Sequence, residues 1–112
     1  MEFFEARAFT RHVSEYLKDD QYRELQTLLI LSPLEGEVMQ GAGGFRKLRW
    51  GDERRGKGKR GGLRVIYYYF EETEQLWMLA IYDKNTLKDL SAAEKSMLKQ
   101  ALEREKKARR LE

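Results

Sequence analysis

The chain opens on a short aromatic run and then changes to the spacing of a helix. Residues 2–5 hold two phenylalanines between two glutamates, a pattern that is compatible with a brief first strand. From Ala6 onwards the apolar positions fall at i, i+4, i+7 and i+8, on Phe9, Val13, Tyr16 and Leu17. These positions share one face of a helix, so the sequence predicts a first helix here.

A second helix is predicted directly after the first. Asp19 or Asp20 is a suitable N-cap, because a carboxylate accepts hydrogen bonds from the free N–H groups of a first turn. The apolar face that follows consists of Tyr22, Leu25, Leu28 and Leu29. The helix should end near Leu31, because Pro33 disfavours the helical conformation of the residue before it.

The middle of the chain predicts loops on both sides of one strand. Residues 32–44 contain the only proline and four glycines, which favours a loop. Phe45, Leu48 and Trp50 then alternate imperfectly with basic residues, as in a half-buried strand. Residues 51–62 hold five glycines and five basic residues without a period, so they should form a loop between two strands.

Two apolar runs, residues 63–70 and 76–82, predict a β-hairpin around the polar turn 71–75. Both faces of each run are apolar or aromatic, which is typical of central strands. If the turn centres on Thr73, Arg64 lies opposite Tyr82. Strict alternation would place Trp77, Leu79 and Ile81 on one side of the second strand, and Leu76, Met78, Ala80 and Tyr82 on the other.

A last helix is predicted after a connection that ends near Leu90. Ser91 and Glu94 have the spacing of a capping box, and Met97, Leu98, Ala101 and Leu102 give an apolar stripe. The charged residues beyond this stripe should be a solvated extension of the helix. The sequence thus predicts one α+β domain over residues 1–112, with its helices against one face of an antiparallel sheet.

Composition narrows the classes of function. The chain has no cysteine, which excludes a disulfide framework, a cysteine-based zinc site and a thiol nucleophile. With one histidine and no carboxylate constellation, we expect neither a metal site nor a cofactor. The apolar runs are too short to span a membrane, and the N-terminal residues lack the pattern of a signal peptide. We therefore expect a cytoplasmic protein.

Positive charge is concentrated in one stretch. Residues 46–64 carry nine basic and two acidic residues, a net +7, whereas the whole chain carries +3 and the remainder therefore −4. Such a cluster on a mildly acidic body favours a polyanionic partner. The candidate RNA-binding residues are Arg46, Lys47, Arg49, Arg60 and Lys84, and the candidate catalytic residues are Lys57, Lys59, Arg64 and Tyr82.

These residue types match the requirements of RNA cleavage by its own 2′-hydroxyl, which needs a base, an acid and a group that stabilises phosphate charge. Arginine stays charged and suits the phosphate. A lysine among other cations has its charged form disfavoured, so it can exchange protons near neutral pH. A tyrosine ring can stack on a base. The same groups suit RNA binding without catalysis, and composition alone favours this function over cleavage. A DNA-binding regulator is a weaker alternative, because no predicted helix-turn-helix carries the positive charge.

Three segments resemble the HigB branch of the RelE-type bacterial toxins. They are residues 41–49 (GAGGFRKLR), residues 56–68 (GKGKRGGLRVIYY), and residues 81–85 (IYDKN) with Asp89-Leu90-Ser91 after them. The resemblance covers most of the chain in the same order. It implies a small microbial-RNase-like α+β fold and ribosome-dependent cleavage of mRNA in the A site. It also implies neutralisation by an antitoxin encoded beside the toxin, typically of the helix-turn-helix type.

On this resemblance, Lys57 and Lys59 act in proton transfer and phosphate contact, and Arg64 stabilises the scissile phosphate. Tyr82 stacks on or orients the RNA, and Lys84 stands where the family often carries a further cation. The sequence departs from RelE itself at Asn85, which lies near an arginine position there. No residue here matches the C-terminal tyrosine of RelE, so the general acid and base stay unassigned between the lysines.

Overall fold

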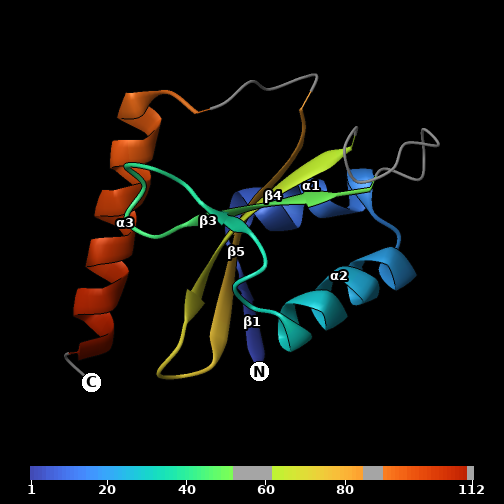
Figure 1. Ribbon diagram of the computed structural model, residues 1–112, viewed down its shortest axis with the longest axis horizontal. Helices are drawn as coiled ribbons and strands as arrows, with labels where there is room; N and C mark the ends of the chain where they lie inside the picture. Colours follow the sequence, from blue (N-terminus) through green and yellow to red (C-terminus); the bar gives the residue numbers. More distant parts are fainter. Residues whose placement is uncertain (52–61, 85–89, 111–112) are drawn as a thin grey trace.

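The computed structural model describes residues 1–51, 62–84 and 90–110 and shows an α+β domain (Figure 1). The elements are β1 (Glu2–Glu5), α1 (Arg7–Tyr16), α2 (Asp19–Leu31), β2 (Glu37–Val38), β3 (Arg46–Trp50), β4 (Leu63–Phe70), β5 (Gln75–Asp83) and α3 (Ala92–Arg110). They form one sheet in the order β1-β5-β4-β3-β2, in which β1 runs parallel to β5 and the other neighbours are antiparallel. The predicted fold class, the hairpin and the central position of β4 are confirmed. The short edge strand β2 lies in a segment that was predicted as loop.

Helices cover both faces of the sheet, so the prediction that they share one face is wrong. Figure 1 shows α1 and α2 on one side of the strands and α3 on the other. One core cluster joins Phe9 and Leu25 to Val65 and neighbouring strand residues, and a second cluster joins Leu102 to Ile66. The physical reason is that β4 and β5 are apolar on both faces, and each apolar face must be buried.

The two ends of α2 test the predictions made for that helix. At α2 the N-cap is Lys18, whose backbone N–H donates to Gln21 Oε1 at 2.9 Å, so a cap by Asp19 or Asp20 is wrong. Both aspartates instead lie in the first turn of α2, where the helix dipole favours negative charge. The predicted end at Leu31 is confirmed.

The capping box of α3 is confirmed. The Ser91 backbone N–H donates to Glu94 Oε1 at 2.9 Å, and the Glu94 N–H donates to Ser91 Oγ at 3.1 Å. Hydrogen bonds that the Glu94 carboxyl accepts from the backbone N–H and the side chain of Ser91 hold its pKa below its ordinary value. The start of α3 is therefore fixed at the end of the domain where the candidate site lies.

A β-bulge at Leu79 sets the register of the hairpin. Near the turn Phe70 pairs with Gln75, one residue out of the predicted register, but beyond the irregularity Arg64 pairs with Tyr82 as predicted. The extra residue also breaks the predicted alternation, since Ile81 joins the core beneath α1 and α2. Tyr82 consequently joins the core beneath α3, on the same face as Arg64.

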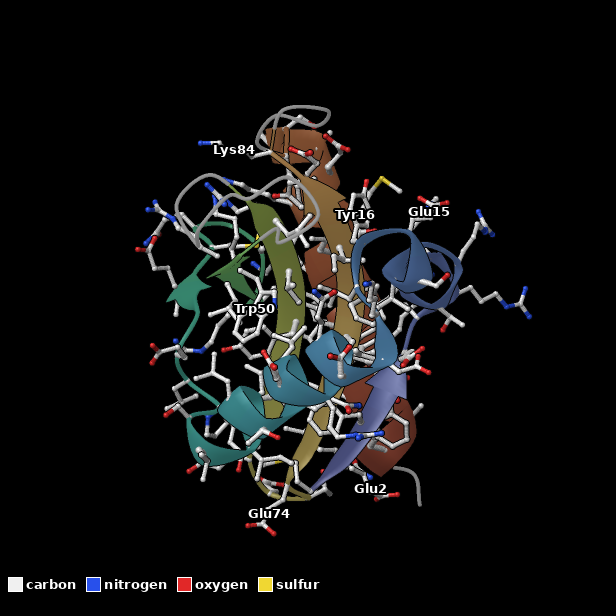
Figure 2. All side chains as sticks on the ribbon, turned by 90° about the vertical axis from the view of Figure 1, so that its right-hand side faces the viewer. Glu2, Glu15, Tyr16, Trp50, Glu74 and Lys84 are labelled. Atoms are coloured by element: carbon white, nitrogen blue, oxygen red, sulfur yellow. The ribbon has the colours of Figure 1, made fainter. Side chains whose placement is uncertain are left out.

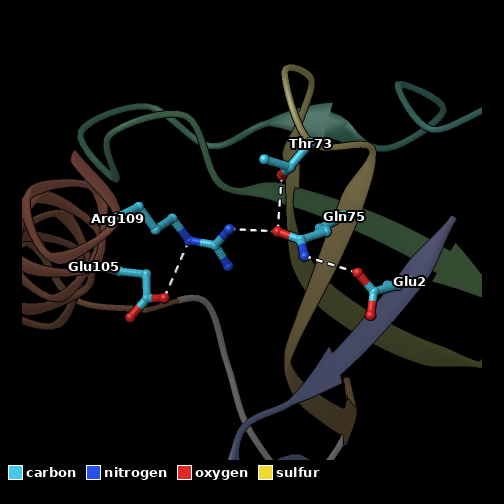
Figure 3. A network of polar contacts seen from close by, with 5 residues as sticks. All are labelled: Glu2, Thr73, Gln75, Glu105 and Arg109. Atoms are coloured by element: carbon cyan, nitrogen blue, oxygen red, sulfur yellow. Dashed lines mark hydrogen bonds and ion pairs between the residues drawn. The ribbon is translucent and has the colours of Figure 1, made fainter. Parts of the chain in front are cut away.

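The far end of α3 is packed on the sheet and is not a solvated extension. The guanidinium carbon of Arg109 lies 3.9 Å from the centroid of the Phe70 ring. Figure 3 shows the polar network around it: Arg109 bonds to Gln75 Oε1 and to Glu105, and Gln75 bonds to Glu2 and Thr73. The predicted apolar stripe of α3 also needs one correction, because Met97 is 67% exposed.

Within the described ranges, no helix is both long and apolar enough to cross a membrane.

The joint between β1, α1 and α2 predicts a pH-dependent stability. The Tyr22 hydroxyl donates to Glu5 Oε2 at 2.6 Å. Burial, followed by the hydrogen bond to Glu5 and its charge, raises the pKa of Tyr22 above its ordinary value. A raised folded-state pKa stabilises the protein below the unfolded value of about 10, and that stabilisation is lost as pH rises further.

Tyr22→Phe should accordingly lower the free energy of unfolding at pH 7 by about 1 to 2 kcal/mol, because it removes a bond to a charged acceptor. The difference from wild type should shrink above pH 10, and urea unfolding at a series of pH values measures it. Tyr69→Phe is the matched control, because it makes the same change at a half-buried ring on β4. A Tyr22→Phe difference that stays constant up to high pH would contradict the assignment.

Candidate nucleic-acid interface

Two neighbouring strands, β3 and β4, bring basic residues to one end of the sheet on the face that α3 covers. In the register of the sheet, Arg49 lies opposite Arg64, and Arg64 lies opposite Tyr82. Lys47, two residues before Arg49 on β3, lies opposite Ile66. Cross-strand partners share a face, and both Ile66 and Tyr82 belong to the core beneath α3. Lys47, Arg49 and Arg64 therefore lie on this face, and we call them the cation row.

The pair of Arg49 and Arg64 within the cation row is electrostatically unfavourable by itself. Like charges directly opposite each other on neighbouring strands destabilise a sheet. Arg64 is half-buried, and one of its terminal nitrogens donates to the Leu63 carbonyl at 3.2 Å. Across the described residues, no carboxylate forms an ion pair with Arg49 or Arg64. Two arginines opposite each other, with no ion-paired carboxylate among the described residues, suit a phosphate, which can accept several of their N–H groups.

A small cleft adjoins the cation row. It has a volume of about 170 Å³ and is lined by residues 37–40, Lys47, Tyr82, Leu90 and Lys95. Lys95 lies in the first turns of α3 and is half-buried, and it was not among the predicted site residues. No local signal in the sequence could have found it, because it meets the other lining residues only through the packing of α3 on the sheet.

Tyr82 lines this cleft and is 7% exposed. It packs in the core cluster that includes Ile66 and Leu102. A base can stack only on a ring face that solvent reaches. Because the Tyr82 ring is buried in this structure, it does not offer the open stacking surface that the sequence predicted.

Arg46 is separated from the other predicted RNA-binding residues. It lies opposite Tyr67, which belongs to the core beneath α1 and α2, so it is on the other face of the sheet. One terminal nitrogen of Arg46 donates to the carbonyls of Leu34, at 3.2 Å, and of Gly36, at 2.8 Å. These bonds tie the loop before β2 to the sheet.

We expect Arg46→Met to lower the free energy of unfolding by about 1.5 to 3 kcal/mol, because bonds from a charged donor are lost and a half-buried carbonyl is left unpaired. Thermal or urea unfolding measures this effect. Arg23→Met is the control, since Arg23 is exposed on α2. Equal stabilities of the two variants would show that the Arg46 bonds do not hold the loop.

The remaining predicted residues are placed only in part. Lys84 is exposed directly after β5, and Figure 2 shows it at the opposite end of the molecule from Glu2 and Glu74. Its strand position, two residues beyond Tyr82, puts it at the same end of the sheet as the cation row. Lys57, Lys59 and Arg60 lie outside the described residues.

Comparison with known proteins gives similarities of fold at low sequence identity. No family model matches the chain. One similar solved structure is a mutant of the E. coli toxin RelE in the free state, with 16% identity, a TM-score of 0.48, and coverage of 76% of this chain and 84% of that one. A second is the isolated E. coli RelE toxin, with 11% identity, a TM-score of 0.49, and coverage of 89% of this chain and 97% of that one.

Proposed function

We propose that this protein is the toxin of a toxin–antitoxin pair: a metal-independent endoribonuclease that cleaves mRNA in the ribosomal A site and so inhibits translation. The observation that carries the proposal is the pairing of Arg49 with Arg64 across β3 and β4, next to a cleft. The resemblance of residues 41–49, 56–68 and 81–85 to the HigB branch supports it independently of the geometry. The proposed partners are ribosome-bound mRNA and a cognate helix-turn-helix antitoxin, in the cytoplasm.

In the proposed reaction, the 2′-oxygen of one ribose attacks the adjacent phosphorus while the bond from phosphorus to the 5′-oxygen breaks. A base takes the proton of the 2′-hydroxyl, and an acid gives a proton to the departing 5′-oxygen. The products are a 2′,3′-cyclic phosphate and a 5′-hydroxyl. Lys57 and Lys59 are the proposed proton-transfer groups, and Arg60 and Lys84 are proposed to contact the RNA backbone.

Arg64 and Arg49 are proposed to hold the non-bridging oxygens of the scissile phosphate. Negative charge builds up on these oxygens as the pentavalent transition state forms. Donors that are already fixed in place stabilise that charge without reorganising at the moment of reaction. Arg64 is half-buried on a central strand, so the sheet fixes its position.

One observation favours an alternative, a non-catalytic module that binds RNA or a protein. Tyr82, proposed from the resemblance to orient the RNA, is almost fully buried. Without an exposed ring at that place, the site would hold phosphate through charge but would lack one of the groups that align the reacting atoms.

Expression in bacteria separates the two functions. The proposal predicts that induction arrests growth and produces mRNA ends that map within translated codons. Co-expression of the helix-turn-helix protein encoded next to the gene should relieve the arrest. Normal growth with intact messages, from a protein that is folded and abundant, would favour the binding module.

A further inference from the structure

We propose that the cleft beside the cation row binds one nucleotide of the RNA chain next to the scissile phosphate, and that Lys95 holds the phosphate of that nucleotide. This inference rests on the proposed function, because it takes RNA as the ligand. It adds a binding residue from α3, a helix that contributes nothing to the predicted site.

The cleft has the size and the lining of a subsite for one unit of a longer ligand. Its volume of about 170 Å³ is below the range of about 300 to 1,000 Å³ typical of pockets for a whole small molecule. Met39 and Leu90 supply apolar walls against which a base can pack. The amide of Gln40 and the carboxylate of Glu37 supply hydrogen-bonding groups for a base edge.

The charged side chains that line the cleft favour an anionic ligand. Lys47 and Lys95 both line it, against the single carboxylate of Glu37. Lys95 is also near the N-terminus of α3, where the helix dipole opposes positive charge. Glu37 on β2 lies opposite Lys47, so the two ammonium groups and one carboxylate leave the lining of the cleft with a net positive charge, which favours a phosphate.

The cleft continues the cation row along the sheet. Lys47 belongs to both, and Arg49 lies two residues further along β3 on the same face. Residues two apart on a strand are separated by about 7 Å. An extended RNA strand can therefore place one phosphate at the two arginines and the neighbouring phosphate at Lys47 and Lys95.

The test is a titration of the protein with a short uncleavable RNA in which every 2′-hydroxyl is replaced by hydrogen or a methoxy group. NMR amide shifts should move at Lys47, Leu90 and Lys95. The affinity should fall with salt, and Lys95→Gln should reduce the slope of log K against log salt by about 0.7, the value for one phosphate contact on a single strand. Lys107→Gln, the same charge change at an exposed position of α3, should leave the slope unchanged, and Lys95→Arg should restore it.

Equal salt slopes for wild type and Lys95→Gln would overturn the inference, as would amide shifts that avoid the cleft or an absence of any shift. A general effect of α3 on the fold would change the thermal stability of Lys95→Gln without changing its salt slope. A different outcome would contradict the proposed function without contradicting RNA binding in the cleft. If the slope changes as expected but ribosome-bound mRNA stays intact, the cleft binds RNA and the protein is not a nuclease.

Discussion

Replacing Arg64 with glutamine should reduce the cleavage of ribosome-bound mRNA by about 100- to 1,000-fold, the loss typical for removing one preorganised donor to transition-state charge. In the register of the sheet, Arg64 lies between Arg49 of the cation row and Tyr82. Glutamine keeps much of the side-chain length but removes the charge and the bidentate fork. The loss should fall mainly on the rate of the chemical step, because the charge on the phosphate rises in the transition state.

Single-turnover cleavage measures that rate, and far-UV circular dichroism checks that the variant is folded. Arg11→Gln is the matched control. It makes the same change of charge at an exposed position on α1, across the sheet from the cation row. Undiminished cleavage by Arg64→Gln would remove Arg64 from the site.

Replacing Leu102 with alanine should lower the free energy of unfolding by about 2 to 5 kcal/mol, the usual cost of emptying a buried leucine position. Leu102 is 1% exposed and lies in the core cluster that joins α3 to the sheet. The loss should also lower activity at temperatures where the protein remains folded, because Lys95 reaches the cleft from the first turns of the same helix and Leu90 lies just before that helix.

Met97→Ala provides the comparison within the same helix. Met97 is 67% exposed, so its truncation should change stability by no more than about 0.5 kcal/mol. Urea unfolding of the two variants measures the difference. Similar urea midpoints for Leu102→Ala and Met97→Ala would mean that α3 is not held on the sheet through Leu102.

The sequence predicts the main elements well because their signals are local. The capping box at Ser91 and Glu94, the end of α2 before Pro33, and the two-faced strand Leu63–Phe70 each depend on neighbouring residues alone. The pairing of Arg64 with Tyr82 was also predicted. It arises, however, from a turn one residue shorter than assumed and a bulge at Leu79 that restores the register.

The features that could not be predicted from the sequence depend on tertiary packing. α3 covers the face of the sheet whose apolar surface α1 and α2 leave open. No local pattern in the sequence predicts which face this is. The same is true of Arg46, which shares a basic run with Lys47 but lies on the opposite face because side chains alternate along a strand. Lys95 was missed because it is distant in sequence from the basic stretch and reaches the cleft only when α3 docks.

Single-turnover cleavage of an mRNA on stalled ribosomes with an empty A site tests the central claim most directly. We expect the wild-type protein to cut the message within the A-site codon, to leave a 2′,3′-cyclic phosphate, and not to cut a message with a 2′-deoxy nucleotide at the reacting position. An intact all-ribose message, or equal cutting of the 2′-deoxy message, would contradict it.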